Sequence, residues 1–274
     1  MNAVSSSWGW LRGHAMQIYA VLAVLYMLIP IAVIIVFSFA ATPKGRLTFA
    51  IDEGFTTEYW SSAFSLPDLN EALFTSLKLA TASTVIATAI GTLMALALVR
   101  YTFRGRYMSN LLIILPMATP EVVIGASLLS LFIYYTFSLG FETLLIAHIT
   151  FSISFVVVVV RSRLIGFDRH LEEAAADLGA TPLATFRYVT LPLLAPGILA
   201  AAMLAFALSI DDFVISNFNS GTTVTFPLYV YGVSLRGIPV QVNVLATMLF
   251  ALTVIAAMLV LFQQRRAERM AATA

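Results

Sequence analysis

Residues 161–196 read RSRLIGFDRHLEEAAADLGATPLATFRYVTLPLLAP and separate two long apolar runs of the chain. A connection this long inside a compact membrane protein usually carries a function. The acidic start and the small residues that follow predict a short helix over 171–178. Gly179 comes directly after it and permits the positive φ of a helix C-terminus. The first half of the segment is therefore expected to be a helix that ends in a tight glycine turn.

A second short helix is predicted after this turn. It opens at Thr181 or Pro182, because proline suits the first turn of a helix. It ends at Pro192, because proline has no amide hydrogen with which to continue a helix. Alanines in the first helix allow another surface to come close, with acidic residues on one half of the segment and Arg187 on the other. The segment is thus expected to be a lever that docks into a groove on a partner.

The rest of the chain has the composition of a membrane protein. Apolar residues make up 60% of its 274 residues and charged residues 11%, against about a quarter charged in soluble proteins. The absence of cysteine excludes disulfides, thiolate metal sites and cysteine nucleophiles. A spanning helix needs about 20 mostly apolar residues, and backbone groups in lipid favour helices over open sheets. The sequence predicts an all-α polytopic protein with six transmembrane helices, over 17–40, 72–99, 109–136, 142–160, 197–216 and 243–263.

Arginine predicts the orientation of these spans, because cytoplasmic loops carry an excess of Lys and Arg. One set of loops and ends holds Arg12, Arg100, Arg104, Arg106, Arg161, Arg163, Arg169, Arg187, Arg265, Arg266 and Arg269. The alternate loops hold Lys44, Arg46 and Arg236. Both termini are therefore expected in the cytoplasm, with a tail over 1–16, a transmembrane domain over 17–264 and a tail over 265–274. The first apolar run is too long for the core of a cleaved signal peptide, which has about 7–15 residues.

Two shorter patterns concern packing and surfaces. Small residues recur at four-residue spacing in the second span, at Ala87, Gly91 and Ala95, and this spacing lets helices approach closely in lipid. The outer loop over 52–71 combines acidic residues with Phe55, Tyr59 and Trp60. It is expected to form a short helix at the headgroups, a docking face for an external partner, or both.

The long loop resembles the EAA loop of ABC importer permeases. Glu173-Ala174-Ala175 is followed after three residues by Gly179 and after nine more by Val189-Thr190-Leu191-Pro192. The family pattern has Ile where Val189 stands. The segments 101–105, 141–155, 162–168, 209–212 and 242–247 are further similar to the PotC-like permeases of bacterial spermidine/putrescine importers.

This resemblance implies a type I ABC importer permease (MetI-like) fold in the bacterial cytoplasmic membrane. It implies a second, paralogous permease, two ATP-binding subunits and an extracytoplasmic polyamine-binding protein as partners. The loop 161–196 then couples to the ATPase, through Glu172, Glu173, Ala174, Ala175, Asp177, Gly179, Arg187, Leu191 and Pro192. The chain has no G-x-x-x-x-G-K-[ST] sequence, so ATP and Mg are assigned to the partner ATPases. No catalytic residue, metal or cofactor is expected in this chain, and no nucleic acid among its partners.

Three acidic residues fall within the predicted spans away from their first residues, where an ionisable group costs about 3 kcal/mol or more. Glu121 lies about twelve residues into the third span, near the membrane midplane at about 1.5 Å per residue. Pro116 and Pro120 flank it and are expected to kink the helix and free carbonyl groups. Asp211 and Asp212 interrupt the fifth span. The three acids predict a lining that attracts cations.

A polyamine is a chain of ammonium groups on a hydrocarbon spine, so it would bind spaced carboxylates with aromatic faces between them. The predicted substrate pathway consists of Glu121, Asp211, Asp212, Phe213, Tyr229 and Tyr231. Structural roles remain open. An aspartate could cap a broken helix or pair with the partner permease, and Glu121 could bond to backbone groups freed by Pro120.

Other functions fit the sequence less completely than an ABC importer permease does. An ion-coupled secondary transporter fits the spans and acids but leaves the loop unexplained. An intramembrane protease could use Ser127 and His148, although the residue after the serine is Leu128, where glycine is wanted. Within ABC importers, thiamine, ferric ion or a phosphonate is the alternative substrate, and an anion fits three acids poorly.

Overall fold

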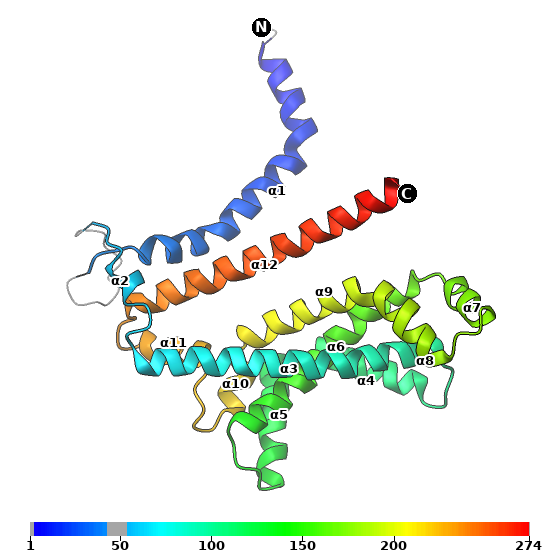
Figure 1. The fold of residues 1–274 in the computed structure, drawn as a ribbon. Coiled ribbons are helices and arrows are strands. Elements are labelled where there is room, and N and C mark those ends of the chain that lie inside the picture. Colours follow the sequence, from blue (N-terminus) through cyan, green and yellow to red (C-terminus); the bar gives the residue numbers. More distant parts are fainter. Residues whose placement is uncertain (1–2, 43–53, 274) are drawn as a thin grey trace. The chain divides into compact units, whose positions relative to one another are not determined.

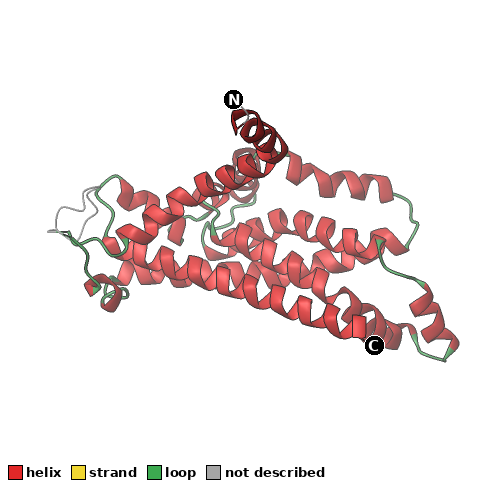
Figure 2. Ribbon diagram, turned by 90° about the horizontal axis from the view of Figure 1, so that it is seen from above, coloured by secondary structure: helices red, strands yellow, loops and turns green. Residues whose placement is uncertain are grey.

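The computed structural model describes residues 3–42 and 54–273. This part of the chain is helical, with an isolated antiparallel bridge between Ala40 and Phe55 and no longer strand among the described residues. The chain divides into two compact units, Met1–Leu66 with Val233–Ala274 and Pro67–Gly232. The two units are described separately below (Figures 1 and 2).

The first unit holds α1 (Ala3–Phe37), α2 (Glu58–Ser61) and α12 (Val240–Thr273), and α12 contacts both of the others. The short helix predicted in the outer loop is α2. It is fixed to the end of α1 by Trp60, whose ring stacks on Phe39 with centroids 5.0 Å apart. The Tyr59 hydroxyl also donates to the Thr42 carbonyl at 3.1 Å. Asp52 and Glu53, predicted to make this loop acidic, lie outside the described residues.

The second unit is built on three long helices that pack side by side (Figure 1). These are α3 (Pro67–Arg100), α6 (Phe141–Ile165) and α9 (Leu191–Ile210). The small residues of α3 lie in their shared core. A Cβ atom on Gly91 would stand 2.6 Å from Val156 Cγ1, and Ala87 and Ala95 are fully buried. The predicted close approach along this small-residue face is therefore confirmed.

Shorter elements connect and flank these three helices. They are α4 (Arg106–Ala118), α5 (Glu121–Tyr134), α7 (His170–Asp177), α8 (Pro182–Thr185), the π-helical turn Phe186–Thr190, α10 (Val214–Asn219) and α11 (Phe226–Ser234). Within this unit α10 packs on α5 and α6, and α4 packs on α6.

Five helices of the described residues are long and apolar enough to cross a membrane, and the number is six if α4 and α5 count as one bent span. The third predicted span, 109–136, is not one kinked helix. It is divided into α4 and α5, and the chain bends by 112° between them. Thr119 and Pro120 are both extended there, with ψ of 133° and 135°. Proline disfavours helical geometry at the residue before it, so Pro120 breaks the helix after Ala118.

Two predicted helix ends are also wrong. The fifth span ends at Ile210 and not at 216, since Asp211 to Phe213 interrupt it before α10 begins. Pro192 does not end the second loop helix. The helix runs on from Pro182 to Ile210 because a π-helical turn precedes the proline, with the Leu191 amide donating to the Phe186 carbonyl five residues earlier.

Candidate functional site: a coupling loop and an acidic cluster

The glycine turn of the loop has the predicted backbone. Gly179 has φ of +84° with open space around its Cα. Its amide donates to the Ala176 carbonyl at 2.9 Å, and the Ala180 amide donates to the Ala175 carbonyl at 3.0 Å. These two bonds close the C-terminus of α7 in the way that a left-handed glycine allows. The next helix then starts with Thr181, whose side chain accepts from the Ala184 amide at 3.3 Å.

The two neighbouring glutamates of the loop face opposite environments. The Glu173 side chain is 68% exposed and lies 3.2 Å from His170 Nδ1, whereas the Glu172 side chain is 13% exposed. Most other predicted coupling residues are exposed, and Ala175 is half-buried. The outward group consists of Glu173, Ala174, Asp177, Gly179, Arg187, Leu191 and Pro192.

Sequence reasoning missed three apolar side chains on this loop. Leu178, Leu183 and Tyr188 are exposed on this loop. Exposed large apolar side chains can form surfaces that bind another protein. The sequence has no local signal that separates them from apolar residues of the same segment that are covered in the structure, such as Leu194.

Glu172 points inward and joins three elements. Its carboxylate forms an ion pair with Arg100, the last residue of α3, and accepts a hydrogen bond from the Thr190 hydroxyl in the π-helical turn. Burial by itself raises the pKa of this carboxyl. The bonds from Arg100 and Thr190, with the charges of Arg100 and Arg169, outweigh burial and hold the pKa of Glu172 below its ordinary value.

The predicted acids lie at the starts of two helices that pack on each other. Glu121 is the first residue of α5, and Asp211 and Asp212 lie in the break before α10. The two helices pack along one another, with Asn219 Nδ2 donating to the Gly125 carbonyl at 3.2 Å. Glu121 interacts electrostatically with both aspartates. Its predicted place along a continuous helix is wrong, because the chain turns sharply just before it.

Asp212 differs from the other two acids because it is buried and already bonded. It is 9% exposed and accepts the backbone amides of Ile215 at 3.2 Å and Ser216 at 2.7 Å. His148 Nε2 lies 3.4 Å from it. The predicted alternative in which an aspartate caps the broken helix is therefore confirmed for Asp212. Glu121 and Asp211 are exposed.

His148 belongs to a buried polar cluster. Its Nδ1 lies 2.7 Å from the Ser209 hydroxyl of α9, and its Nε2 lies 3.0 Å from the Ser216 hydroxyl of α10. Ser209 also bonds to Ser83 of α3 at 3.0 Å. His148 therefore bonds to two neighbouring helices, α9 and α10. Both ring nitrogens have partners other than Ser127, so the geometry of a serine–histidine dyad is not formed.

The predicted aromatic residues divide into two sets. The rings of Phe213 and Tyr231 lie 4.8 Å apart, tilted by 47°, beside the break that holds the aspartates. Tyr229 is two residues from Tyr231 on α11, which turns it to another side of the helix. It is half-buried and interacts electrostatically with Asp68. Phe213 and Tyr231 are therefore joined near the acids, and Tyr229 is not placed with them.

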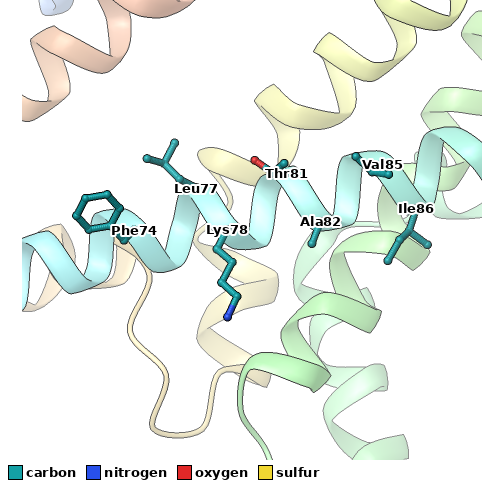
Figure 3. A pocket seen from close by; sticks show the side chains of 7 residues that line it. All are labelled: Phe74, Leu77, Lys78, Thr81, Ala82, Val85 and Ile86. Carbon is teal, nitrogen blue, oxygen red and sulfur yellow. The ribbon is translucent and has the colours of Figure 1, made fainter.

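An open apolar depression on α3 lies apart from the predicted sites. It is lined by Phe74, Leu77, Lys78, Thr81, Ala82, Val85 and Ile86. Figure 3 shows Lys78 projecting from this helix face, and its Nζ lies 4.9 Å from the centre of the Phe141 ring. No predicted site residue contributes to it. The Lys78 ammonium group thus forms a cation–π contact with the Phe141 ring.

The long apolar helices and the helical core are typical of a polytopic membrane protein. Residues 87–269 match the family described as the binding-protein-dependent transport system inner membrane component. The chain belongs to this family.

Within this family, the chain is similar to permease proteins of polyamine transport systems. The chain is 42% identical over 248 residues to the spermidine/putrescine transport system permease protein PotC of Escherichia coli, covering 89% of this chain and 90% of the relative. It is 37% identical over 229 residues to PotC of Haemophilus influenzae, covering 83% and 88%. It is 33% identical over 252 residues to the putrescine transport system permease protein PotI of Escherichia coli, covering 89% and 88%.

Solved structures share the fold at low identity. A bacterial ABC transporter for the import of the acidic polysaccharide alginate aligns with a TM-score of 0.65 at 17% identity, covering 96% of this chain and 99% of that one. An amino acid ABC transporter aligns with a TM-score of 0.59 at 20% identity, covering 77% and 100%. The all-α fold of an ABC importer permease is thereby confirmed.

Proposed function

We propose that this chain is a permease subunit of an ATP-driven importer of polyamines, with spermidine or putrescine as substrate. The observation that carries the proposal is the exposure of two electrostatically interacting carboxylates, Glu121 and Asp211, in a chain related to polyamine permeases. Carboxylates in membrane segments are costly and therefore typical of ion or substrate pathways. The paired rings of Phe213 and Tyr231 add an aromatic face for an ammonium group.

The proposed complex contains this chain, a paralogous permease, two ATPase subunits that bind ATP and Mg, and an extracytoplasmic binding protein. The arginine-rich loops and both termini lie in the cytoplasm in this scheme. The outward group of the coupling loop, together with Leu178, Leu183 and Tyr188, docks on an ATPase subunit. ATP-driven closure of the ATPases moves the loop and opens the pathway to the outside. The cation then moves from the binding protein to the exposed acids, and hydrolysis returns the pathway to the inside.

The substrate is tested by competition in cells that lack polyamine import and express the whole complex. Uptake of labelled spermidine is measured with an excess of unlabelled spermidine, putrescine or thiamine. A linear polyamine matches spaced carboxylates, so unlabelled spermidine or putrescine is expected to abolish uptake and thiamine to leave it unchanged. If labelled spermidine and labelled putrescine are not taken up while the same complex imports labelled thiamine, the polyamine proposal is contradicted and the importer fold is unaffected.

A further inference from the structure

The coupling loop is connected to the core of its unit by backbone at both ends and by one ion pair. At one end a short link joins α6 to α7, and at the other the helix that starts at Pro182 runs through the π-helical turn into α9. The ion pair joins the carboxylate of Glu172 on α7 to the guanidinium of Arg100 at the end of α3. The side chains of Glu172 and Arg100 are 13% and 20% exposed, so water screens the pair only partly.

The Arg100 guanidinium has a second contact that fixes its position. Its Cζ lies 5.7 Å from the centre of the Phe167 ring, in the link between α6 and α7. A planar guanidinium can bind a carboxylate through two parallel hydrogen bonds and lie against an aromatic face at the same time. Lysine could not reproduce both contacts. The geometry therefore uses the specific shape of arginine.

The ion pair between Arg100 and Glu172 lies at a cavity between α3 and α7. The close packing of α7 is with α8 and the π-helical turn. Between α7 and α3 lies a cavity of about 330 Å³, whose lining includes Leu96 and Arg100 from α3 and Glu172 and Ala176 from α7. Side chains on opposite sides of a cavity lack the van der Waals contacts of a packed interface. The paired charges of Arg100 and Glu172 thus form a direct link between α3 and α7 across it.

We propose that Arg100 and Glu172 form an electrostatic strut that makes α3 follow the coupling loop. Backbone continuity moves α9 with the loop, and the strut moves α3 with it. Both helices belong to the core of this unit, since α3 and α9 pack on α6. The inference rests on the proposed function, and it changes the role of Glu172 from a docking residue to a positioning residue. Thr190 holds the carboxylate in place from the π-helical turn.

Charge exchange tests the strut in the reconstituted complex, with uptake and ATP hydrolysis measured on the same vesicles. Arg100→Glu or Glu172→Arg alone places like charges together. Each is expected to lower the number of polyamine molecules imported per ATP by about tenfold while hydrolysis continues, within the usual size of coupling between sites. The double exchange restores opposite charges and is expected to return the ratio to within about threefold of wild type.

The matched control is Arg104→Glu, which removes an exposed arginine near α3 and should leave the ratio unchanged. The strut is contradicted if single reversals that assemble keep the wild-type ratio, or if the double exchange is as poor as the singles. Should the reversals fail to assemble, Glu172→Gln keeps the side-chain shape and removes the charge. It is expected to lower the ratio by about threefold, and an unchanged ratio would overturn the strut.

The wild-type complex separates the strut from the proposed function. If wild type imports no polyamine with ATP, the proposed function fails whatever the variants do. If wild type imports and the charge reversals couple equally well, the strut alone fails.

Discussion

Asp211 and Asp212 are neighbours in sequence with different tasks. Asp212 is buried, accepts two backbone amides of α10 and lies beside His148. Asp211 is exposed and interacts with the charge of Glu121. The exposed pair can meet a cation that enters the pathway. The buried Asp212 instead stabilises the break between α9 and α10 by accepting backbone amides at the start of α10.

Neutral replacements distinguish these two roles. Asp211→Asn should raise the KM for polyamine uptake by about tenfold, the effect of about 1.4 kcal/mol of lost binding, with normal thermal stability of the purified protein. Asp212→Asn should instead lower the free energy of unfolding by about 2 kcal/mol, because it weakens a buried, charge-assisted network. Uptake kinetics and thermal unfolding are measured on both variants. A raised KM confined to a stable Asp212→Asn protein would reverse the assignment.

The sequence identified the candidate acidic residues but not the residues with which they interact. Glu121, Asp211, Asp212 and the loop glutamates were all identifiable, because a charge in an apolar run is conspicuous. Their partners were not, since Arg100 is 72 residues from Glu172 and His148 is 61 residues from Ser209. Such pairings depend on which helix faces meet, and periodicity in one segment does not specify them.

At the scale of elements, Gly179 lies in the turn between α7 and the helix that begins at Pro182. Its φ of +84° costs an ordinary L-residue about 1–2 kcal/mol, and more for a β-branched side chain. Space is not the constraint, because no neighbouring atom would obstruct a Cβ there. The restriction is conformational.

Gly179→Val should therefore abolish uptake while the protein still inserts in the membrane, since the change deforms the turn and leaves the helical core intact. Uptake and the amount of membrane-inserted protein are both measured. Gly179→Asn is the matched control, because asparagine tolerates a positive φ, and it should retain most of the uptake. Normal transport by Gly179→Val would sink the lever interpretation.

The sequence predicted correctly that the chain bends near Pro120. The prediction that Pro192 ends a helix was wrong. Pro192 removes a donor from the helix, yet the preceding π-helical turn lets the backbone pass, with Leu191 bonded to Phe186. Pro120 separates α4 from α5 by a bend of 112°. The same residue type continues one helix and breaks another, because the outcome depends on whether the neighbouring turn can rearrange its hydrogen bonds.

For the whole molecule, composition and the long loop were sufficient to predict a polytopic helical permease. Apolar spans follow from lipid and need no partner information. The fold does not choose the substrate, since structures for alginate and for amino acids share it at 17% and 20% identity. Substrate selection therefore has to be sought in side chains at the pathway, where Glu121 and Asp211 are the exposed acids of the predicted set.

The most direct test of an ATP-driven polyamine permease is uptake into vesicles that contain the purified complex. Labelled spermidine and the binding protein are supplied on the binding-protein side, with ATP on the ATPase side. Spermidine should accumulate only with hydrolysable ATP and should not respond to collapse of ion gradients, since the energy enters through the coupling loop. Accumulation that persists without ATP and disappears when the ion gradients are collapsed would contradict this account.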